Sequence, residues 1–259
     1  MSRCSDIEYS RVAGAPLMLD AAIPRGTGPF PAVIIVHGGG WVRGDRRVDV
    51  QPLFQPLMEA GFAWFSISYR LMTDVTKFGD AVQDVEAAIR FVKSHAAEYR
   101  VNSSRIALIG ESAGGHLAAM AAMASSPELR VRAVVALYAP TDLLSLAQGS
   151  KYVPQWVHDN LQGGPLSRII AERLKQFSPI EHVQRDTPPF LLIHGTADPL
   201  VPFAQSKAMC DRMKDVGACC ALYAVAGAGH GIRRWESSPQ IAEPYKREMV
   251  RWIREQLST

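Results

Sequence analysis

The chain has 259 residues, of which 47% are hydrophobic and 20% are charged. This ordinary globular composition fits an α/β domain, and folding at this length buries roughly three quarters of the surface of the unfolded chain, so no metal or disulfide is needed to stabilise a core. The formal net charge of +3 is spread along the sequence in short clusters, which argues against nucleic acid as a partner. We therefore expect a single domain over residues 1–259.

The sequence shows no export or membrane signal. Its first ten residues, MSRCSDIEYS, lack the apolar core of a signal peptide, and no run of about 18 apolar residues could span a membrane. We expect a soluble protein with no membrane partner, cytoplasmic as the sequence stands and secreted if a signal peptide has been removed.

The four cysteines have neither CxxC spacing nor a matching histidine cluster, so neither a zinc site nor a disulfide framework is indicated. Cys210, Cys219 and Cys220 fall in apolar helix and strand patterns. This pattern predicts buried free thiols.

Short apolar segments bounded by Gly and Pro alternate with helical patterns from about residue 31 to the end of the chain, which is typical of βαβ units. The predicted strands are 32–38, 62–69, 105–111, 133–139, 190–195 and 220–226. Because these segments are almost continuously hydrophobic, they predict a mostly parallel sheet covered by helices on both faces.

Three helices are predicted from the spacing of apolar residues. One is amphipathic and extends from Phe78 past Val92, another ends the chain near Leu257, and the segment 113–123 is apolar and small on every side, as expected of a buried helix. Residues 141–187 interrupt the alternation of predicted strands and helices, and they contain several prolines and a Gly-Gly pair. We expect them to form a short helical excursion, a minimal cap over one end of the sheet.

The strongest chemical signal is Gly110-Glu111-Ser112-Ala113-Gly114, which stands between a predicted strand and the buried helix. This context is typical of a nucleophile elbow, in which a strained turn exposes the serine hydroxyl and side chains at the two glycine positions would clash. The turn places Ser112 at a helix N-terminus, where developing negative charge is stabilised. Ser112 is therefore the candidate nucleophile.

A second signal, HGGGW at residues 37–41, directly follows the first predicted parallel strand. Successive glycines leave backbone N–H groups unobstructed, so the amides of Gly39 and Gly40, together with that of Ala113, form a candidate oxyanion hole. A phosphate-binding loop is the alternative, but the GxxxxGK[ST] and GxGxxG patterns are absent.

In folds that carry such a nucleophile elbow, the acid and then the histidine base follow the serine along the chain. Of the seven histidines, His230 lies in a glycine-rich loop after the last predicted strand and before the last helix, where a base is expected. His116 is placed one turn beyond Ser112 on the buried helix and is better suited to packing or to bonding a backbone group. His230 is therefore the candidate base.

Asp198 is the candidate acid, because it follows the strand 190–195 and would emerge at the carboxyl end of the sheet. Asp142 follows the preceding strand and is the rival, although a carboxylate there is usually a helix cap or a loop anchor. Glu111 is expected to point away from Ser112 and to form a structural ion pair. Arg70 and Asp84 are expected to pair as part of the scaffold.

Four motifs occur in order along the chain: HGGGW at 37–41, GESAGG at 110–115, HGTADPLVP at 194–202 and GAGHG at 227–231. With them the chain resembles the α/β-hydrolase esterases grouped with the bacterial feruloyl and acetyl-xylan esterases, and more loosely the hormone-sensitive-lipase group. The resemblance covers residues 30–255. It implies the α/β-hydrolase fold, a Ser112–Asp198–His230 triad, oxyanion amides at Gly39, Gly40 and Ala113, and no metal or other cofactor.

One departure from the lipase-like group concerns the N-terminus, since only 36 residues precede His37 where those proteins usually have a long cap. A more open site is expected, which favours carbohydrate esters and other short-chain or aromatic acyl esters as substrates. Trp41, Trp156 and His158 are candidates to line the pocket, and both tryptophans fit a scaffold role equally well. A peptidase, amidase or arylformamidase with the same triad is the alternative function, and a non-catalytic binding module is a third.

Overall fold

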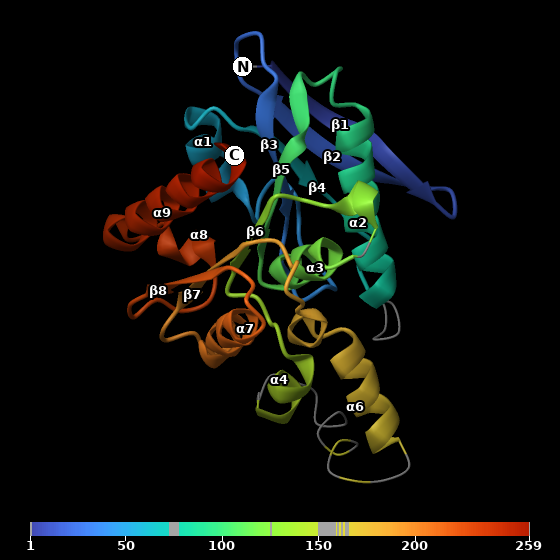
Figure 1. Ribbon diagram of the computed structural model, residues 1–259, viewed down its shortest axis with the longest axis vertical. Coiled ribbons are helices and arrows are strands. Elements are labelled where there is room, and N and C mark those ends of the chain that lie inside the picture. The colour runs from blue at the N-terminus through green and yellow to red at the C-terminus, as the bar shows by residue number, and fades with distance from the viewer. Residues whose placement is uncertain are drawn as a thin grey trace.

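The computed structural model describes residues 2–72, 78–124, 126–149, 159, 161, 163 and 166–258. An eight-stranded sheet runs through the molecule in the order β1-β2-β4-β3-β5-β6-β7-β8 (Figure 1). The strands are β1 (Ser2–Val12), β2 (Ala15–Ile23), β3 (Phe30–Val36), β4 (Ala63–Ile67), β5 (Val101–Glu111), β6 (Ala133–Leu137), β7 (Phe190–Gly195) and β8 (Cys220–Val225). The helices are α1 (Gln51–Glu59), α2 (Phe78–Ser94), α3 (Ala113–Ala122), η2 (Pro127–Leu129), α4 (Leu143–Gly149), α6 (Ser167–Gln176), η3 (Pro179–His182), α7 (Ala204–Asp215), α8 (Ile232–Trp235) and α9 (Pro239–Ser258).

All six predicted strands are present as β3 to β8, and they pair in parallel throughout. Two further strands were not predicted. β1 and β2 form an antiparallel hairpin, and β2 pairs antiparallel with β4. β1 is mostly exposed, and it lacks the apolar run by which the buried parallel strands are recognised. The sheet is therefore mixed but mostly parallel.

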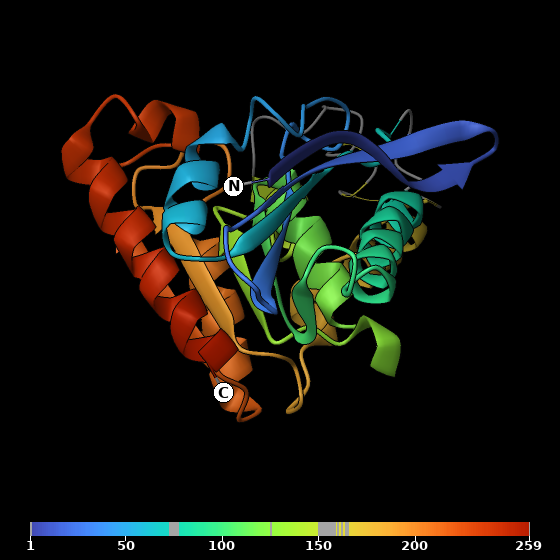
Figure 2. The same ribbon diagram turned by 90° about the horizontal axis from the view of Figure 1, so that it is seen from above.

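Helices cover both faces of the sheet, as predicted. α1 and α9 lie on one side, and α2 and α3 lie on the other (Figure 2). The alternation of side chains along each strand separates the two cores: Ile34 of β3 packs with the α2 and α3 side, whereas Val33 and Ile35 pack with the α1 and α9 side. Nine of the ten residues of α3 are buried, in agreement with its small, uniformly apolar sequence.

The excursion over residues 141–187 contributes α4, α6 and η3. Of these, α4 and α6 lie at one end of the molecule (Figure 1). Its first residues are anchored, because the amides of Thr141 and Asp142 both donate to Gln205 Oε1, at 2.9 and 2.8 Å. By contrast, α6 has no buried residue. Trp156 and His158, which the sequence suggests as pocket residues, lie outside the described residues.

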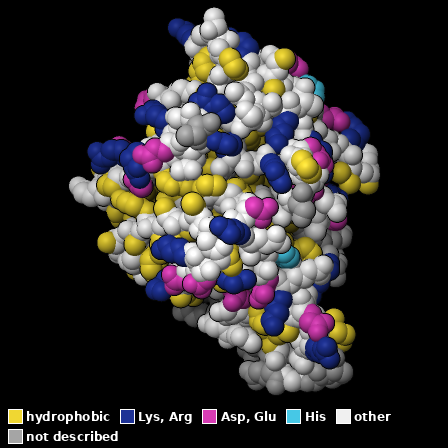
Figure 3. All heavy atoms as spheres, viewed as in Figure 1, with side chains coloured by type: hydrophobic (Ala, Val, Ile, Leu, Met, Phe, Trp, Pro, Cys, Tyr) yellow, Lys and Arg dark blue, Asp and Glu magenta, His cyan; other side chains and the backbone are white. Residues whose placement is uncertain are grey.

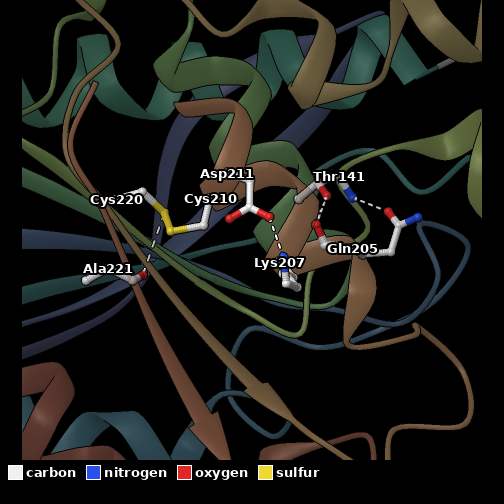
Figure 4. The surroundings of a disulfide bond; sticks show 7 residues. All are labelled: Thr141, Gln205, Lys207, Cys210, Asp211, Cys220 and Ala221. Atoms are coloured by element: carbon white, nitrogen blue, oxygen red, sulfur yellow. Dashed lines mark hydrogen bonds and ion pairs between the residues drawn. A yellow bond between two sulfur atoms is a disulfide. The ribbon is translucent and has the colours of Figure 1, made fainter. Parts of the chain in front are cut away.

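The prediction of free, buried cysteines was wrong. Cys210 of α7 and Cys220 at the start of β8 form a disulfide bond (Figure 4), and Cys4 and Cys219 are free but exposed. The sequence pattern placed Cys210 on a helix and Cys220 on a strand correctly. It did not show that α7 packs against β8, bringing the two Cα atoms to 5.4 Å.

Charge is evenly mixed on the face seen in Figure 3, where basic side chains are interspersed with acidic ones. No helix of the described residues combines the length and the apolar character that a membrane crossing requires.

Candidate active site

Ser112 stands at the junction of β5 and α3 in a strained backbone conformation, with φ 53° and ψ −121°. A Cβ atom at Gly110 would lie 2.2 Å from the Gly114 oxygen, and one at Gly114 would lie 2.2 Å from the Val36 oxygen. Only glycine fits at either position, as the motif predicts. The Ser112 amide donates to the Leu137 oxygen at 2.8 Å, which fixes the turn against β6. The packing of glycines thus holds the strained residue in place.

Ser112, His230 and Asp198 are brought together by loops that follow β5, β8 and β7. His230 Nε2 lies 2.9 Å from Ser112 Oγ, and His230 Nδ1 lies 2.7 Å from Asp198 Oδ2. The other carboxylate oxygen of Asp198 accepts the amides of Leu200 and Val201 at 2.9 and 3.0 Å. With Nδ1–H donated to Asp198, Nε2 is left to accept the Ser112 proton.

His194 is a further partner of Asp198 that the sequence did not indicate. This fully buried side chain places Nε2 3.4 Å from Asp198 Oδ2, and its Nδ1 is 2.7 Å from Ser206 Oγ of α7. Burial alone would raise the pKa of Asp198, but its hydrogen bonds with His194 and His230 outweigh burial and hold that pKa below its usual range. Asp198 is therefore a stable anion facing His230.

The glycine loop after β3 turns sharply beside Ser112. Gly39 and Gly40 have φ values of 105° and 62°. The carbonyl oxygen of Gly39 accepts a hydrogen bond from the Arg43 amide at 3.2 Å. Their amides, like that of Ala113, have no hydrogen-bond partner among the described residues, and all three residues line the same pocket as Ser112. The loop therefore presents unoccupied N–H donors next to the serine hydroxyl.

Glu111 forms no ion pair within the described residues, contrary to the sequence-based expectation. Its carboxylate instead accepts the Gly38 amide at 2.6 Å and a hydrogen bond from the Tyr138 hydroxyl, and Tyr138 in turn accepts the Ile232 amide at 2.7 Å. Burial raises the pKa of Glu111. Because Ile232 follows the His230 loop, one buried carboxylate connects the glycine loop to that loop.

Other predicted scaffold groups behave as expected. Arg70 pairs with Asp84 at 2.7 Å, and Asp142 accepts the Ser145 amide at 2.9 Å in the manner of a helix cap. His116 is fully buried, with Nε2 2.7 Å from the Phe177 oxygen, and its Nδ1 accepts the indole N–H of Trp41 at 3.1 Å. Neither Asp142 nor His116 touches the Ser112 hydroxyl.

The serine opens into a pocket of about 950 Å³. Its apolar lining includes Trp41, Pro140, Leu146, Leu200, Val201 and Ile232, and its charged lining comes from Arg43, Asp49, Glu111, Arg233 and Arg234. Trp41 thus lines the pocket and also contacts His116. Within the described part of the chain, no three His, Cys, Asp or Glu residues are grouped so that they could hold a metal ion. The arrangement brings a serine hydroxyl, an imidazole and unoccupied backbone N–H groups to one pocket, and acyl transfer uses groups of these kinds as nucleophile, base and oxyanion donors.

The sequence profile of the BD-FAE family matches residues 19–213, which is most of the chain. The chain belongs to the BD-FAE family. This is a family of α/β-hydrolase esterases that includes bifunctional feruloyl and acetyl-xylan esterases, and the resemblance inferred from the four motifs is confirmed. The matched range contains Ser112 and Asp198, and His230 lies beyond it.

Individual relatives agree with this membership. Esterase LipC of Mycobacterium tuberculosis is 32% identical over 80% of this chain, and the chain spans about half the length of the curated relatives it matches. Among solved structures, a truncated carbohydrate esterase from gut microbiota has a TM-score of 0.80 at 27% identity and covers 100% of this chain and 97% of its own. Esterase Est2 of Thermogutta terrifontis, with propionate bound, has a TM-score of 0.78 at 26% identity, with 97% and 93% covered.

Proposed function

We propose that the protein is a serine carboxylesterase that hydrolyses short-chain acyl esters through an acyl-enzyme on Ser112. The observation that carries this proposal is the continuous hydrogen-bonded chain from Asp198 through His230 to Ser112, at 2.7 and 2.9 Å. Support for short acyl groups comes from Est2 of T. terrifontis, which has been solved with propionate and with butyrate bound. Acetyl or feruloyl esters of plant carbohydrate are the natural substrates that family membership favours.

In the proposed mechanism, Ser112 Oγ attacks the ester carbonyl while His230 Nε2 takes its proton. The carbonyl oxygen becomes an oxyanion and accepts hydrogen bonds from the amides of Gly39, Gly40 and Ala113. The tetrahedral intermediate then expels the alcohol, which receives the proton from His230. Water attacks the acyl-Ser112 ester in the same way, with His230 first as base and then as acid, and releases the carboxylic acid.

Asp198 has a defined part in this cycle. His230 becomes an imidazolium ion twice per turnover, and the carboxylate 2.7 Å from Nδ1 stabilises that charge and fixes the tautomer. Because its pKa is held below the usual range, Asp198 keeps its negative charge throughout. Glu111 takes no part in proton transfer. It positions the glycine loop through the Gly38 amide and the segment after His230 through Tyr138.

The proposal is tested by hydrolysis of p-nitrophenyl acetate and of acetyl p-nitroanilide by wild-type protein and by Ser112→Ala. We expect the ester to be cleaved much faster than the anilide, and kcat for the ester to fall by about 10⁴-fold or more in the variant, which loses its nucleophile. A variant with a tenth of wild-type turnover would remove Ser112 from the mechanism. Faster cleavage of the anilide would instead support the amidase alternative.

Labelling with a fluorophosphonate provides an independent readout that does not require turnover. T. terrifontis esterase 2 has been obtained phosphorylated by paraoxon, and we expect wild-type protein, but not Ser112→Ala, to gain one phosphonyl group by mass spectrometry. Absence of labelling in the wild type would favour a non-catalytic binding module.

A further inference from the structure

Three arginines, Arg43, Arg233 and Arg234, line the pocket that contains Ser112. Arg43 follows the glycine loop, and the other two belong to α8, which begins directly after the His230 loop. All three are exposed, so they form a rim around the pocket rather than part of its buried floor. The rim brings positive charge from two separate segments to one opening.

Few negative charges oppose these arginines. Among the described residues that line the pocket, the carboxylates are those of Asp49 and Glu111, and Glu111 is buried and already accepts the Gly38 amide. Asp49 lies 3.4 Å from Arg233 in an exposed ion pair. Arg43 and Arg234 have no ion pair or side-chain hydrogen bond with any described residue, which leaves both guanidinium groups available to a ligand.

The position of His230 indicates which part of a substrate meets the rim. The leaving oxygen must lie within hydrogen-bonding distance of His230 Nε2 to receive its proton, so the alcohol part of the ester extends on the side of His230. Arg233 and Arg234 follow His230 closely along the chain, separated from it by Gly231 and Ile232. The apolar side chains of Leu146 in α4 and of Leu200 after β7 come from other segments of the pocket and suit the acyl chain.

We propose that the alcohol part of the preferred ester carries a negative charge, and that Arg43, Arg233 and Arg234 bind it. The inference rests on the proposed esterase function and narrows its substrate class to esters of an anionic alcohol. A guanidinium group donates two parallel hydrogen bonds to a carboxylate or a phosphate, and both anions are therefore included in the test.

The test compares acetate esters of matched phenols at pH 7 and low ionic strength. The esters are 4-acetoxybenzoate and 4-acetoxyphenyl phosphate, which are anionic, and 4-acetoxybenzamide, which is neutral and similar in size to the benzoate. Each kcat/KM is divided by the rate of alkaline hydrolysis, which removes differences in leaving-group reactivity. We expect at least one anionic ester to be preferred over the amide by about 5- to 10-fold, since each exposed charge pair contributes a factor of about five or less.

Variants locate the origin of that preference. Replacing the three arginines together (Arg43→Gln, Arg233→Gln, Arg234→Gln) is expected to bring the ratio of anionic to neutral ester to about 1. Asp49→Asn removes the competing carboxylate and should raise the ratio. The matched control is Arg25→Gln, because Arg25 is exposed and follows β2 at the end of the sheet opposite the pocket; it should keep the wild-type ratio. About 0.5 M NaCl should weaken the wild-type preference by screening.

The outcomes separate this inference from the proposed function. If wild-type protein cleaves the neutral ester but shows no preference for either anion, or if the triple variant keeps the wild-type ratio, the anionic alcohol is rejected and the esterase stands. If none of the esters is cleaved, the proposed function fails and this inference falls with it. The larger of the two anionic ratios identifies carboxylate or phosphate as the bound group.

Discussion

The elbow around Ser112 and the excursion over residues 141–187 both border the pocket, but they differ in how closely they are packed. At the elbow, a single added carbon at Gly110 or Gly114 would lie 2.2 Å from a backbone oxygen. In the excursion, α6 has no buried residue and Ile169 is 62% exposed. Leu146 of α4 nevertheless lines the pocket. The close packing holds the reacting groups, whereas the looser segment supplies a wall that is free to vary with substrate.

The largest contrast is expected between Asp198, whose carboxylate supports His230 beside the elbow, and Asp142, a carboxylate of the excursion. Asp198→Asn leaves His230 without its anionic partner and favours the wrong tautomer, so we expect kcat for p-nitrophenyl acetate to fall about 10³- to 10⁴-fold. Asp142→Asn lies at the start of the excursion, where the carboxylate accepts one amide, and should cost much less. Steady-state kinetics on both variants decides the matter. If Asp142→Asn proved the more damaging change, the acid would have to be reassigned to Asp142.

Glycine replacements test the difference in packing directly. Gly114→Ala places a methyl group within 2.3 Å of the Val36 and His37 oxygens, and we expect a loss of about 3 kcal/mol or more in the free energy of unfolding. Gly149→Ala, at the end of α4, meets no atom of a described residue within 4 Å and should change stability by less than about 1 kcal/mol. Urea denaturation measures both. Equal destabilisation by the two changes would contradict the difference in packing between the elbow and the excursion.

The closely packed region is also the one in which the sequence signals are clearest. Ser112, Asp198 and His230 are the candidate site residues because a strained turn and two loop positions demand particular residues at fixed places along the chain, and the structure brings the three side chains within hydrogen-bonding distance. The parallel strands were recognised because they are buried on both faces. In both cases a short stretch of sequence, either a motif or an apolar run, is enough to indicate the local structure.

Features that depend on contacts between distant segments were not predicted. β1 is mostly exposed, so it carries no apolar run. β2 is mostly buried, but its place in the sheet depends on its antiparallel pairing with β4. The Cys210–Cys220 disulfide likewise depends on how α7 docks on β8. The hydrogen bonds of Glu111 and His194 were missed for the same reason. A signal for Glu111 did exist, since buried amides in a glycine loop need an acceptor and Glu111 adjoins the serine beside which that loop was expected.

The pH dependence of stability should reveal how the two regions are joined, because buried His116 of α3 bonds the Phe177 oxygen at the end of the excursion. Burial lowers the pKa of His116 from 6.5 to about 4. Since the unfolded chain binds this proton more readily, stability is complete above about pH 6.5 and declines as the pH falls toward 4, by roughly 3 kcal/mol. Burial also lowers the pKa of His37, which acts in the same direction.

His116→Gln isolates the first of these contributions. The variant lacks the titrating imidazole, so its free energy of unfolding, measured in urea at intervals from pH 7 to pH 4.5, should decline less steeply than that of the wild type. The comparison uses slopes, so it holds even if glutamine lowers stability at every pH. Parallel curves for the two proteins would show that His116 does not titrate with the expected shift.

The smallest expected effect concerns the acyl chain and the looser wall. Pro140, Leu146, Leu200 and Val201 belong to the apolar lining of a pocket that is open to solvent, so p-nitrophenyl esters from acetyl to butyryl should have higher kcat/KM than the decanoyl ester. Each methylene that is bound contributes about 0.8 kcal/mol, or roughly fourfold in kcat/KM. Leu146→Phe adds volume to this wall. It should lower the kcat/KM of the butyryl ester relative to the acetyl ester by about fourfold for each methylene that no longer fits. Ile169→Phe, on the exposed face of α6, is the matched control and should keep the wild-type ratio. An optimum at ten carbons would require a deep apolar channel, and a butyryl-to-acetyl ratio indifferent to Leu146→Phe would place the acyl chain elsewhere in the pocket.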